Sequence, residues 1–313
     1  ILVDVETLDI DASTFRKSLA ESNGDPAAVG EAILAVVRMR GKLHHPVTDA
    51  GGILLGRVAR IGQAVEGQIP LQEGNRIVTL ASLAWTPLAL TRIREIRSDV
   101  GQIDVDGQAV LFPGSLYTTL PSDLPERLVL GVLNVAGAPA MTAKIVREGD
   151  RVVVIGCGKS GLLCLHQATH ATRRADKVIA IDRSPDACRL VESLGLADAT
   201  VRVDATDPLA VHREVDRLTS GLLADTVINV VTTPGTEGGS ILATKDGGTL
   251  YFYSTATSFS AAALQAEGLA REIRMMIGSR YTKGWVEMTL GILWTNAALR
   301  QHLAARYEGK ATG

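Results

Sequence analysis

The stretch VVVIGCGKSG, residues 152–161, decides the fold of this chain. Gly156, Gly158 and Gly161 stand in G-x-G-x-x-G spacing, after an apolar run that predicts a buried strand and before a predicted helix over 159–173. The first glycine permits a tight turn, the second lets the backbone approach a pyrophosphate, and the third lets the helix pack closely on the strand. The N–H groups at the start of the helix, at Lys159 and Ser160, then suit a phosphate.

An acidic residue follows at the distance that dinucleotide binding needs. Asp182, 21 residues beyond Gly161, ends a second predicted strand over Lys177–Asp182. A carboxylate there holds the ribose hydroxyls of NAD and repels the 2′-phosphate of NADP. Arg183 comes next and softens that preference, so we expect NAD as the cofactor and NADP as a second option. The alternative is that the glycines only shape a turn, which the order of strand, loop, helix and acidic residue disfavours.

Strands and helices alternate through the C-terminal half. Four further strands are predicted at Ala199–Val203, Thr226–Val231, Gly248–Tyr253 and Ile273–Ile277. This alternation indicates an α/β domain with a six-stranded, doubly wound parallel sheet, the Rossmann architecture. Ligands of such sheets bind outside the carboxyl ends of the strands. The cofactor-binding residues expected at that edge are Val231, Thr232, Ser254 and Thr255.

A last predicted helix near 285–307 has no further strand to cross to. We therefore expect residues 282–313 to pack back on the first module or on the domain junction. The predicted cofactor domain then covers 133–281, and a second domain covers 1–132.

The first 120 or so residues have a different pattern, of short strands broken by turns. Gly51–Ile61 and Arg76–Leu83 read as strands, and an amphipathic stretch over Ala27–Met39 reads as a helix. Asp106-Gly107, flanked by alternating apolar residues, predicts a two-residue hairpin turn. The N-terminal domain is therefore expected to be rich in β-structure.

Composition excludes several classes of protein. The net charge of -2 lacks the basic excess of a nucleic-acid binder, and aromatic residues, at 4%, are too few for a base-stacking platform. The longest uncharged stretch, Leu128–Ala143, falls short of a membrane span, and no signal peptide is visible. Three cysteines without a C-x-x-C pair favour reduced thiols, so a cytoplasmic location is expected.

Two pairs of histidines are candidate sites. His166 and His170 lie four residues apart on the helix after the glycine loop, but no acidic or Cys ligand is evident nearby, so a solvated or domain-facing pair is expected. His44-His45 precedes a proline, and it is either close to a substrate or part of a polar loop.

The C-terminal half resembles the cofactor domain of the medium-chain dehydrogenase/reductase superfamily. The strings KVIAIDRS (177–184), ADTVINVV (224–231) and KDGGTLYFYS (245–254) carry the likeness, and the N-terminal half is similar to that superfamily's GroES-like substrate domain. The resemblance implies that Thr142 lies near the nicotinamide. Zinc-dependent members carry Cys and Gly-His-Glu ligands in the substrate domain; no Cys precedes Cys157 here, and 49–52 reads DAGG, so no metal is expected.

A closer resemblance covers nearly the whole chain. RGKLHHPVTDAGG (40–52), NVAGAPAMTAKIV (134–146) and FYSTATSFSAAALQAEG (252–268) are similar to the L-erythro-3,5-diaminohexanoate dehydrogenase family. This implies oxidative deamination of a small zwitterionic diamino acid to 5-amino-3-oxohexanoate and ammonia in lysine fermentation. The C3 hydride would pass to the nicotinamide, and water would hydrolyse the iminium. A homodimer or homotetramer is also implied.

The implied chemistry needs a proton acceptor for the C3 amine and a partner for the second ammonium. Glu237 is the preferred candidate, and a helix-capping role is an equal alternative for it; Glu267 and Asp49 are further candidates. Residues expected to line the substrate are Ser82, Thr86 and His45.

Two other functions fit the same architecture. A zinc-free NAD(P)H-dependent quinone or enoyl reductase would need an apolar cleft for a neutral substrate. A non-catalytic dinucleotide sensor would keep the glycine loop and Asp182 but turn over nothing. Assays with the diamino acid, with quinones and enones, and of cofactor binding alone separate the three.

Overall fold

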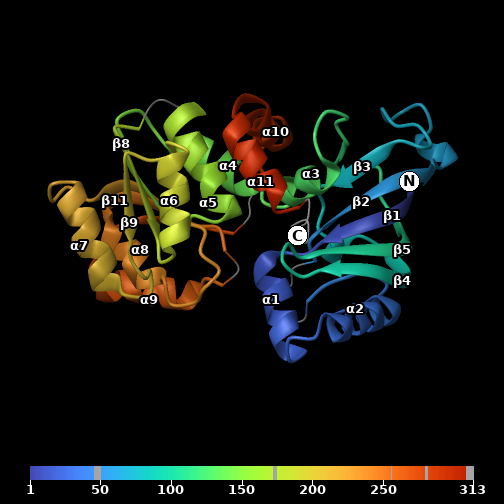
Figure 1. Cartoon of the computed structure of the whole chain (residues 1–313), viewed down its shortest axis with the longest axis horizontal. Coiled ribbons are helices and arrows are strands. Elements are labelled where there is room, and N and C mark those ends of the chain that lie inside the picture. Colours follow the sequence, from blue (N-terminus) through green and yellow to red (C-terminus); the bar gives the residue numbers. More distant parts are fainter. Residues whose placement is uncertain (46–50, 172–174, 255, 279–280, 308–313) are drawn as a thin grey trace, which may run out of the picture. The chain divides into compact units, whose positions relative to one another are not determined.

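The chain divides into two compact units. The computed structural model describes residues 1–45, 51–171, 175–254, 256–278 and 281–307 (Figure 1). Unit 1 comprises 1–134 and 303–313, and unit 2 comprises 135–302. The boundaries therefore fall at 134/135 and 302/303, whereas the sequence suggested 132/133 and 281/282.

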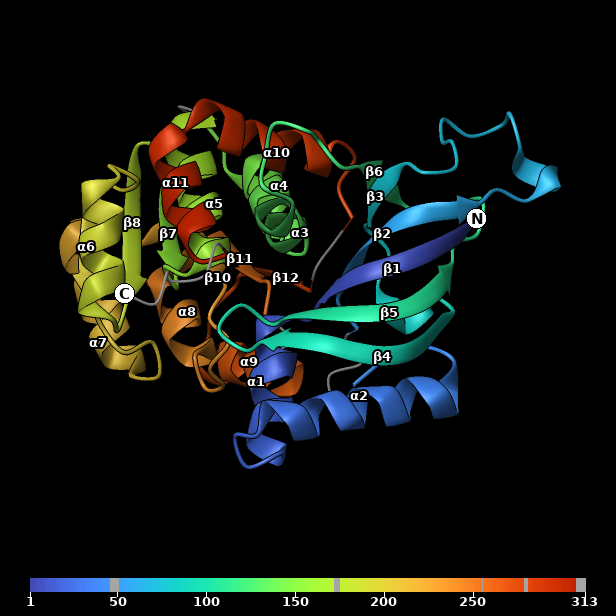
Figure 2. The ribbon, with the colours of Figure 1, turned by 45° about the vertical axis from the view of Figure 1, so that its right-hand side comes forward.

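Unit 1 is built on an antiparallel six-stranded sheet with the order β4-β5-β1-β2-β3-β6. Apolar residues of α2, among them Val29, Ile33 and Val37, share a core with the sheet, and Figure 2 shows this helix lying along β4. The elements are β1 (Leu2–Asp9), α1 (Ala12–Glu21), α2 (Pro26–Arg40), β2 (Ile53–Arg60), η1 (Gln63–Val65), β3 (Arg76–Thr79), η2 (Leu83–Trp85), β4 (Leu88–Arg97), β5 (Gln102–Val110), β6 (Tyr117–Thr119) and α3 (Glu126–Leu133).

The predicted turn at Asp106-Gly107 is wrong. Both residues lie inside β5, which continues to Val110, and the chain reverses at 98–101, where Gly101 has a φ of +73°. The pairing of β5 with β4 and β1 shifts register beside Gly107, and a Cβ there would lie 2.4 Å from the carbonyl oxygen of Ala89. This glycine therefore serves a bulge with close backbone approach, which is the other common use of glycine in strands.

Unit 2 contains the parallel sheet that the sequence predicted. Its strand order, β12-β11-β10-β7-β8-β9, is the doubly wound order, and all six predicted strands are confirmed with small changes at their ends. The elements are α4 (Gly137–Ile145), β7 (Arg151–Ile155), α5 (Lys159–His166), the π-helical η3 (Gln167–Ala171), β8 (Lys177–Asp182), α6 (Pro185–Ser193), β9 (Ala199–Arg202), α7 (Pro208–Leu218), β10 (Ala224–Asn229), α8 (Glu237–Ala243), β11 (Thr244–Phe252), α9 (Phe259–Gly268), β12 (Arg274–Ile277), α10 (Trp285–Thr295) and α11 (Ala297–Ala305).

Helices cover both faces of this sheet, as its buried strands require. Apolar residues of α7, α8 and α9 share one core with Val153 and Ile155 of β7, and α4, α5 and α10 pack together in a second group (Figure 1). The strands read as continuous apolar runs because side chains on both faces are buried; Val152, Val153 and Val154 are all fully buried.

The predicted helix near 285–307 is two helices, broken at Asn296. This residue is extended, with φ -118° and ψ 90°, and its Oδ1 accepts the N–H of Leu299 at 2.9 Å, so it starts α11. Helix α10 packs on α4 and α5, and residues 282–302 are grouped with unit 2.

Only the end of the chain returns to unit 1. Tyr307 is buried there against α3, and a Cβ on Gly131 would lie 2.0 Å from its hydroxyl oxygen. Within the described residues no single helix has the length and hydropathy of a membrane span. Helices α3 and α4 reach that length and hydropathy only when they are counted together, as two helices joined by a bend.

Candidate cofactor-binding and catalytic site

In the glycine loop between β7 and α5, two of the three glycines are closely surrounded by protein atoms and the third is not. A Cβ on Gly161 would lie 1.8 Å from the carbonyl oxygen of Gly156, and Gly156 itself has a φ of +100°. By contrast, no atom lies within 4 Å of a Cβ placed on Gly158. The first and third glycines are thus required by the fold, whereas the space at Gly158 is left open to a ligand.

The start of α5 offers donors to that space. Gly158 is the N-cap, and no side chain caps the first turn, which holds the half-buried Lys159 and Ser160. N–H groups at an uncapped helix start bind anions, and the positive end of the helix dipole adds to this. The loop therefore fits the pyrophosphate of a dinucleotide.

Asp182 lies at the end of β8 and is tied to the same loop. Its Oδ2 accepts the N–H of Cys157 at 2.7 Å, and its Oδ1 accepts the N–H of Ser184 at 2.8 Å. An ionised carboxylate has about four acceptor positions, so two are left for ribose hydroxyls. Cys157 is not a reactive thiol, because burial, and then the Asp182 charge, raises its pKa.

Two arginines lie close to Asp182. Arg183 is exposed, and its carbonyl oxygen accepts from Nε of Arg202 at 3.3 Å. Arg202 is paired with Asp182 in the β8–β9 ladder. The sequence indicated Arg183 but not Arg202, because the parallel pairing of β8 with β9 was needed to bring Arg202 there.

The loop after β10 is held by one buried amide. Asn229 is fully buried; its Nδ2 donates to Oγ1 of Thr236 at 2.9 Å and to Oγ of Ser240 at 2.8 Å, and its Oδ1 accepts the N–H of Val231 at 2.9 Å. The side chain of Val231 lies against Gly156. Val231 and the half-buried Thr232 therefore lie beside the glycine loop, at the switch point between β7 and β10 where such sheets bind ligands.

The segment after β11 is held by Glu237. This side chain is 2% exposed, and its Oε1 accepts the N–H of Ser258 at 2.7 Å. Ser254 is buried, and its Oγ accepts the N–H of Ala256 at 3.1 Å. Thr255, another predicted cofactor ligand, lies outside the described residues.

Two other candidates in unit 2 lie on helices. Glu267 is exposed near the end of α9, which leads from the carboxyl end of β11 back to the amino end of β12, and its catalytic role stays a prediction. Thr142 is fully buried in α4, where its hydroxyl donates to the carbonyl oxygen of Ala138 at 2.9 Å and lies beside the thiol of Cys164.

In unit 1, three predicted substrate residues come from segments that meet at Gly51. A Cβ on Gly51 would lie 2.4 Å from the nitrogen of Ala84 and 2.5 Å from the carbonyl oxygen of Leu43. Ser82 and Thr86 lie two residues before and two residues after Ala84. The Thr86 hydroxyl donates to the Ser82 carbonyl at 3.1 Å. His45 lies two residues after Leu43 and is 9% exposed. Its Nε2 lies 3.6 Å from a carboxylate oxygen of Glu21. Asp49 lies outside the described residues.

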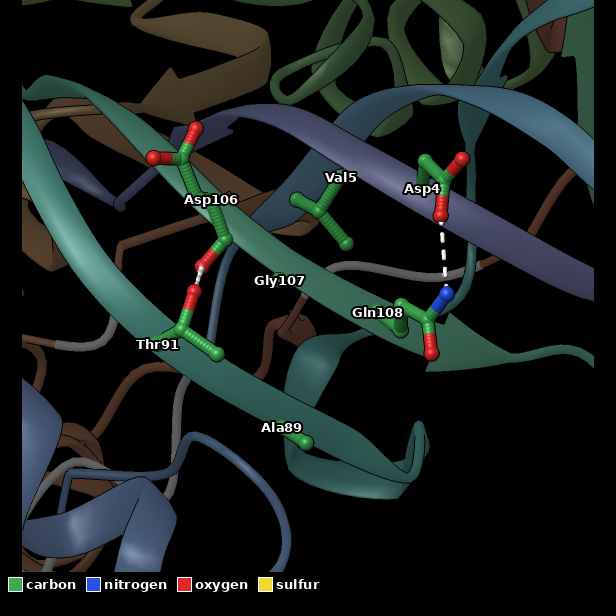
Figure 3. Close-up of a pocket in the computed structure, with 7 residues that line it drawn as sticks. All are labelled: Asp4, Val5, Ala89, Thr91, Asp106, Gly107 and Gln108. Carbon is green, nitrogen blue, oxygen red and sulfur yellow. Dashed lines mark hydrogen bonds between the residues drawn. The ribbon is translucent and has the colours of Figure 1, made fainter.

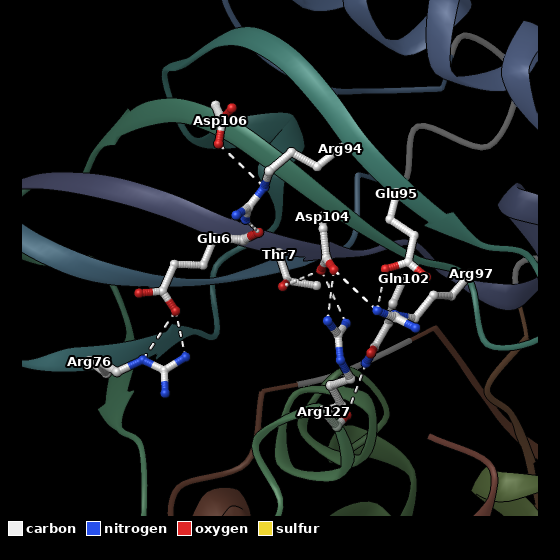
Figure 4. Close-up of polar contacts among 10 residues, drawn as sticks. All are labelled: Glu6, Thr7, Arg76, Arg94, Glu95, Arg97, Gln102, Asp104, Asp106 and Arg127. Atoms are coloured by element: carbon white, nitrogen blue, oxygen red, sulfur yellow. Dashed lines mark hydrogen bonds and ion pairs between the residues drawn. The ribbon is translucent and has the colours of Figure 1, made fainter. Parts of the chain in front are cut away.

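A polar network in unit 1 was not found from the sequence (Figure 4). Arg127 of α3 donates two hydrogen bonds to Asp104, at 3.1 and 2.7 Å, and the Thr7 hydroxyl donates a third at 2.8 Å. Burial alone would raise the pKa of Asp104, but these donors outweigh it and lower the pKa. The network pairs a buried charge and fixes α3 to the sheet, so its role is structural.

A hollow of about 410 Å³ lies on the sheet at the β5 bulge (Figure 3). Its polar groups are paired with one another: the Thr91 hydroxyl donates to the Asp106 carbonyl at 3.0 Å, and Gln108 Nε2 donates to Asp4 at 2.9 Å. None of the predicted site residues lines it. Among the described residues, no group of three or more His, Cys, Asp or Glu could hold a metal ion.

His166 is buried rather than solvated. It is 6% exposed and its ring stacks on that of His170, with centroids 4.8 Å apart and planes 12° apart. Burial, and then the neighbouring His170, lowers the pKa of His166 to about 4. The helix changes to π geometry at Gln167, which alters the facing of side chains that α-helical periodicity predicted.

Comparison with known proteins gives two kinds of likeness. A sequence model described as the L-erythro-3,5-diaminohexanoate dehydrogenase N-terminal domain matches residues 1–121. A protein of Acetoanaerobium sticklandii named L-erythro-3,5-diaminohexanoate dehydrogenase is 39% identical over 308 residues, which are 98% of this chain and 90% of that protein. A protein of the same name from Fusobacterium nucleatum is 39% identical over 302 residues, 96% of this chain and 88% of its own.

Solved structures show the fold. A mycobacterial protein in complex with NADPH superposes with a TM-score of 0.61 at 18% identity, over 98% of this chain and 88% of that one. An alcohol dehydrogenase from Thermotoga maritima superposes with a TM-score of 0.58 at 17% identity, over 98% and 89%. The predicted fold class, a Rossmann sheet joined to a GroES-like substrate domain, is confirmed.

Proposed function

Because this chain belongs to the L-erythro-3,5-diaminohexanoate dehydrogenase family, we propose that it catalyses the NAD(P)-dependent oxidative deamination of L-erythro-3,5-diaminohexanoate. The glycine loop, open only at Gly158 and tied to Asp182, is the observation in unit 2 that carries the proposal. It supplies the dinucleotide site that an amine dehydrogenase needs.

The reaction balances with water as the only further reactant. The substrate loses the C3 hydride and a proton from its C3 ammonium, which leaves a C=N bond at C3. Water adds to that carbon and ammonia leaves, so the products are 5-amino-3-oxohexanoate, ammonium, the reduced cofactor and one proton. The bound nicotinamide supplies the hydride acceptor. The protein must supply a site for the proton and partners for the charges that remain.

The cofactor is held by three neighbouring loops of unit 2. N–H groups at Lys159 and Ser160 bind the pyrophosphate, and the free acceptor positions of Asp182 bind the ribose hydroxyls. Val231 beside Gly156, together with Thr232 and Ser254, forms the part of the carboxyl edge that takes the nicotinamide half. Their position at the switch point of the sheet supports this assignment.

The same site discriminates weakly between the two cofactors. Asp182 favours NAD, because its charge repels a 2′-phosphate. Arg183 and Arg202 lie next to it and are exposed, so they can offer guanidinium partners to that phosphate. We therefore propose that NAD is preferred and NADP is accepted.

Substrate recognition is assigned to unit 1. The segments that carry His45, Ser82 and Thr86 pack closely at Gly51, and this brings three polar residues into one region of unit 1. Nε2 of His45 lies 3.6 Å from a carboxylate oxygen of Glu21, so this region carries polar and charged side chains. These residues suit a zwitterion better than a neutral quinone or enone.

We further propose a cytoplasmic homo-oligomer, a dimer or a tetramer. All three cysteines are free and buried, which suits a reducing compartment. β12 ends the parallel sheet, so its outer edge carries backbone groups that a second copy could pair with. Light scattering on the purified protein measures the assembly state.

The test is a set of parallel assays on the purified protein. Reduction of NAD with the diamino acid, with one ammonia released per reduced cofactor, is the expected result. Oxidation of NADPH by quinones or enones, without turnover of the diamino acid, would replace the proposal with a reductase. Tight cofactor binding without turnover of any of these compounds would indicate a sensor.

A further inference from the structure

Glu237 joins two elements at the carboxyl edge of the parallel sheet. It is the first residue of α8, and its Oε1 accepts the N–H of Ser258, the N-cap of α9, at 2.7 Å. The segment between β11 and α9, which carries Ser254, is therefore held at its far end by a carboxylate from another helix. At its near end it continues from β11 itself.

We propose that Glu237 is a positioning residue of the cofactor site and not the general base. By accepting the N–H of Ser258, its carboxylate holds the start of α9, four residues beyond the buried Ser254. This inference rests on the proposed function only in assigning that edge to the cofactor.

The surroundings of the carboxylate favour this role. The side chain is 2% exposed, and among the residues that the structure describes none forms an ion pair with it. Instead it lies at the first turn of α8 and at the N-cap of α9, where backbone N–H groups and helix dipoles stabilise a negative charge. A general base must reach the proton that it removes, whereas this carboxylate is 2% exposed and one of its oxygens already accepts a backbone N–H.

The neighbouring loop is held in the same way. Asn229 fixes the segment after β10 through Val231, Thr236 and Ser240, and Thr236 is the N-cap of α8, directly before Glu237. Two adjacent loops of the edge are thus fixed by buried side chains that meet at the start of α8. We expect the loss of either side chain to displace a loop that borders the proposed cofactor site.

Four substitutions test the proposal, with the affinity for NADH, kcat, KM and the pH profile as readouts. Glu237→Gln keeps an oxygen that can accept the Ser258 N–H, whereas Glu237→Ala removes it. Ser258→Pro removes the N–H donor, and its φ of -86° lies close to that of proline; Ser258→Ala removes only the side-chain cap on Ala261. Glu192→Gln, an exposed glutamate on α6, is the matched control.

We expect Glu237→Ala and Ser258→Pro each to weaken NADH binding about tenfold or more, as loss of a hydrogen bond to a buried charge predicts. The double variant should be no worse than either single one, because both break the same bond. Glu237→Gln should keep NADH affinity and kcat within about threefold of the parent, with an unchanged pH profile. Ser258→Ala should bind NADH more tightly than Ser258→Pro.

Two results would overturn the inference. If Glu237→Gln kept NADH affinity but lost kcat and the basic limb of the pH profile, Glu237 would be the base. If Glu237→Ala left NADH affinity unchanged, the carboxylate would not position the site. Because NADH affinity is measured without turnover, failure of the parent protein to oxidise the diamino acid would count against the proposed function and leave this result readable.

Discussion

The N–H of Cys157 donates to the carboxylate of Asp182 at 2.7 Å, so the residue expected to bind the cofactor ribose also holds the phosphate-binding loop. One side chain thereby links the two parts of the proposed cofactor site. Substitutions at Asp182 consequently act on loop geometry as well as on cofactor choice.

Asp182→Asn separates these two effects. The amide oxygen can still accept the Cys157 N–H, but the charge that repels a 2′-phosphate is gone. We expect the ratio of kcat/KM for NAD to that for NADP to fall about tenfold or more, with little change in Tm. Asp182→Ala, which removes the acceptor as well, should weaken both cofactors. An unchanged ratio in the Asn variant would show that Asp182 does not face the ribose.

Gly158 and Gly161 should respond differently to alanine. At Gly158 the added methyl meets no protein atom, so Gly158→Ala should fold normally and lose cofactor affinity about tenfold or more. At Gly161 the methyl would lie 1.8 Å from a backbone oxygen, so that variant should lose about 1 to 3 kcal/mol of stability. Thermal unfolding and cofactor titration on both proteins measure the contrast. Equal effects of the two substitutions on Tm would contradict it.

Asp225 should make unit 2 sensitive to acid. Arg151 donates through Nε at 2.7 Å, and Lys245 pairs with the same carboxylate. Burial alone would raise the pKa of Asp225, but these donors hold it well below its usual range. A lowered folded-state pKa gives stability that is present above the unfolded value of about 4 and is lost as pH falls below it.

Asp225→Asn should therefore cost about 2 kcal/mol near pH 7, and its difference from the parent should shrink below about pH 4. Asp186→Asn is the control, since that ion pair with Arg189 is largely exposed and should contribute under about 0.5 kcal/mol. Urea unfolding at a series of pH values measures both. A difference that stayed constant with pH would argue against a charge effect.

His166 should add a second loss of stability in acid. Its pKa is lowered from 6.5 to about 4, so the unfolded chain binds more protons than the folded one between those values, and stability rises with pH across them. The shift corresponds to at most about 3 kcal/mol. We expect His166→Leu to flatten the dependence of unfolding free energy on pH between 4 and 6.5. His170→Leu, at the exposed partner, should flatten it much less.

The fold could be predicted where local pattern and tertiary burial agree. The strands of unit 2, such as Arg151–Ile155, are buried on both faces and therefore read as apolar runs. Asp106-Gly107 misled because the same dipeptide suits a hairpin turn and a bulge, and only the pairing with Ala89 distinguishes them. The break at Asn296 was likewise hidden, since one polar residue in an apolar helix also fits a continuous helix.

Within the candidate site, only the proposed cofactor half is constrained by the sequence. Glycine spacing and an acidic residue at a set distance carry a physical mechanism, and the structure places Asp182 on the loop as that mechanism requires. No comparable spacing rule constrains the catalytic candidates. Residue type alone points to Glu267, whereas its position on α9 depends on where the helix starts and ends.

The close packing of Tyr307 against Gly131 has a consequence for how the chain folds during its synthesis. Residues 1–134 leave the ribosome first, but the packing around α3 is incomplete until a residue more than 170 positions later arrives. The parallel-sheet unit, encoded in between, can fold as one uninterrupted segment. The unit that is translated first therefore finishes folding last, and its partly open surface around α3 would be the region that chaperones encounter on the nascent chain.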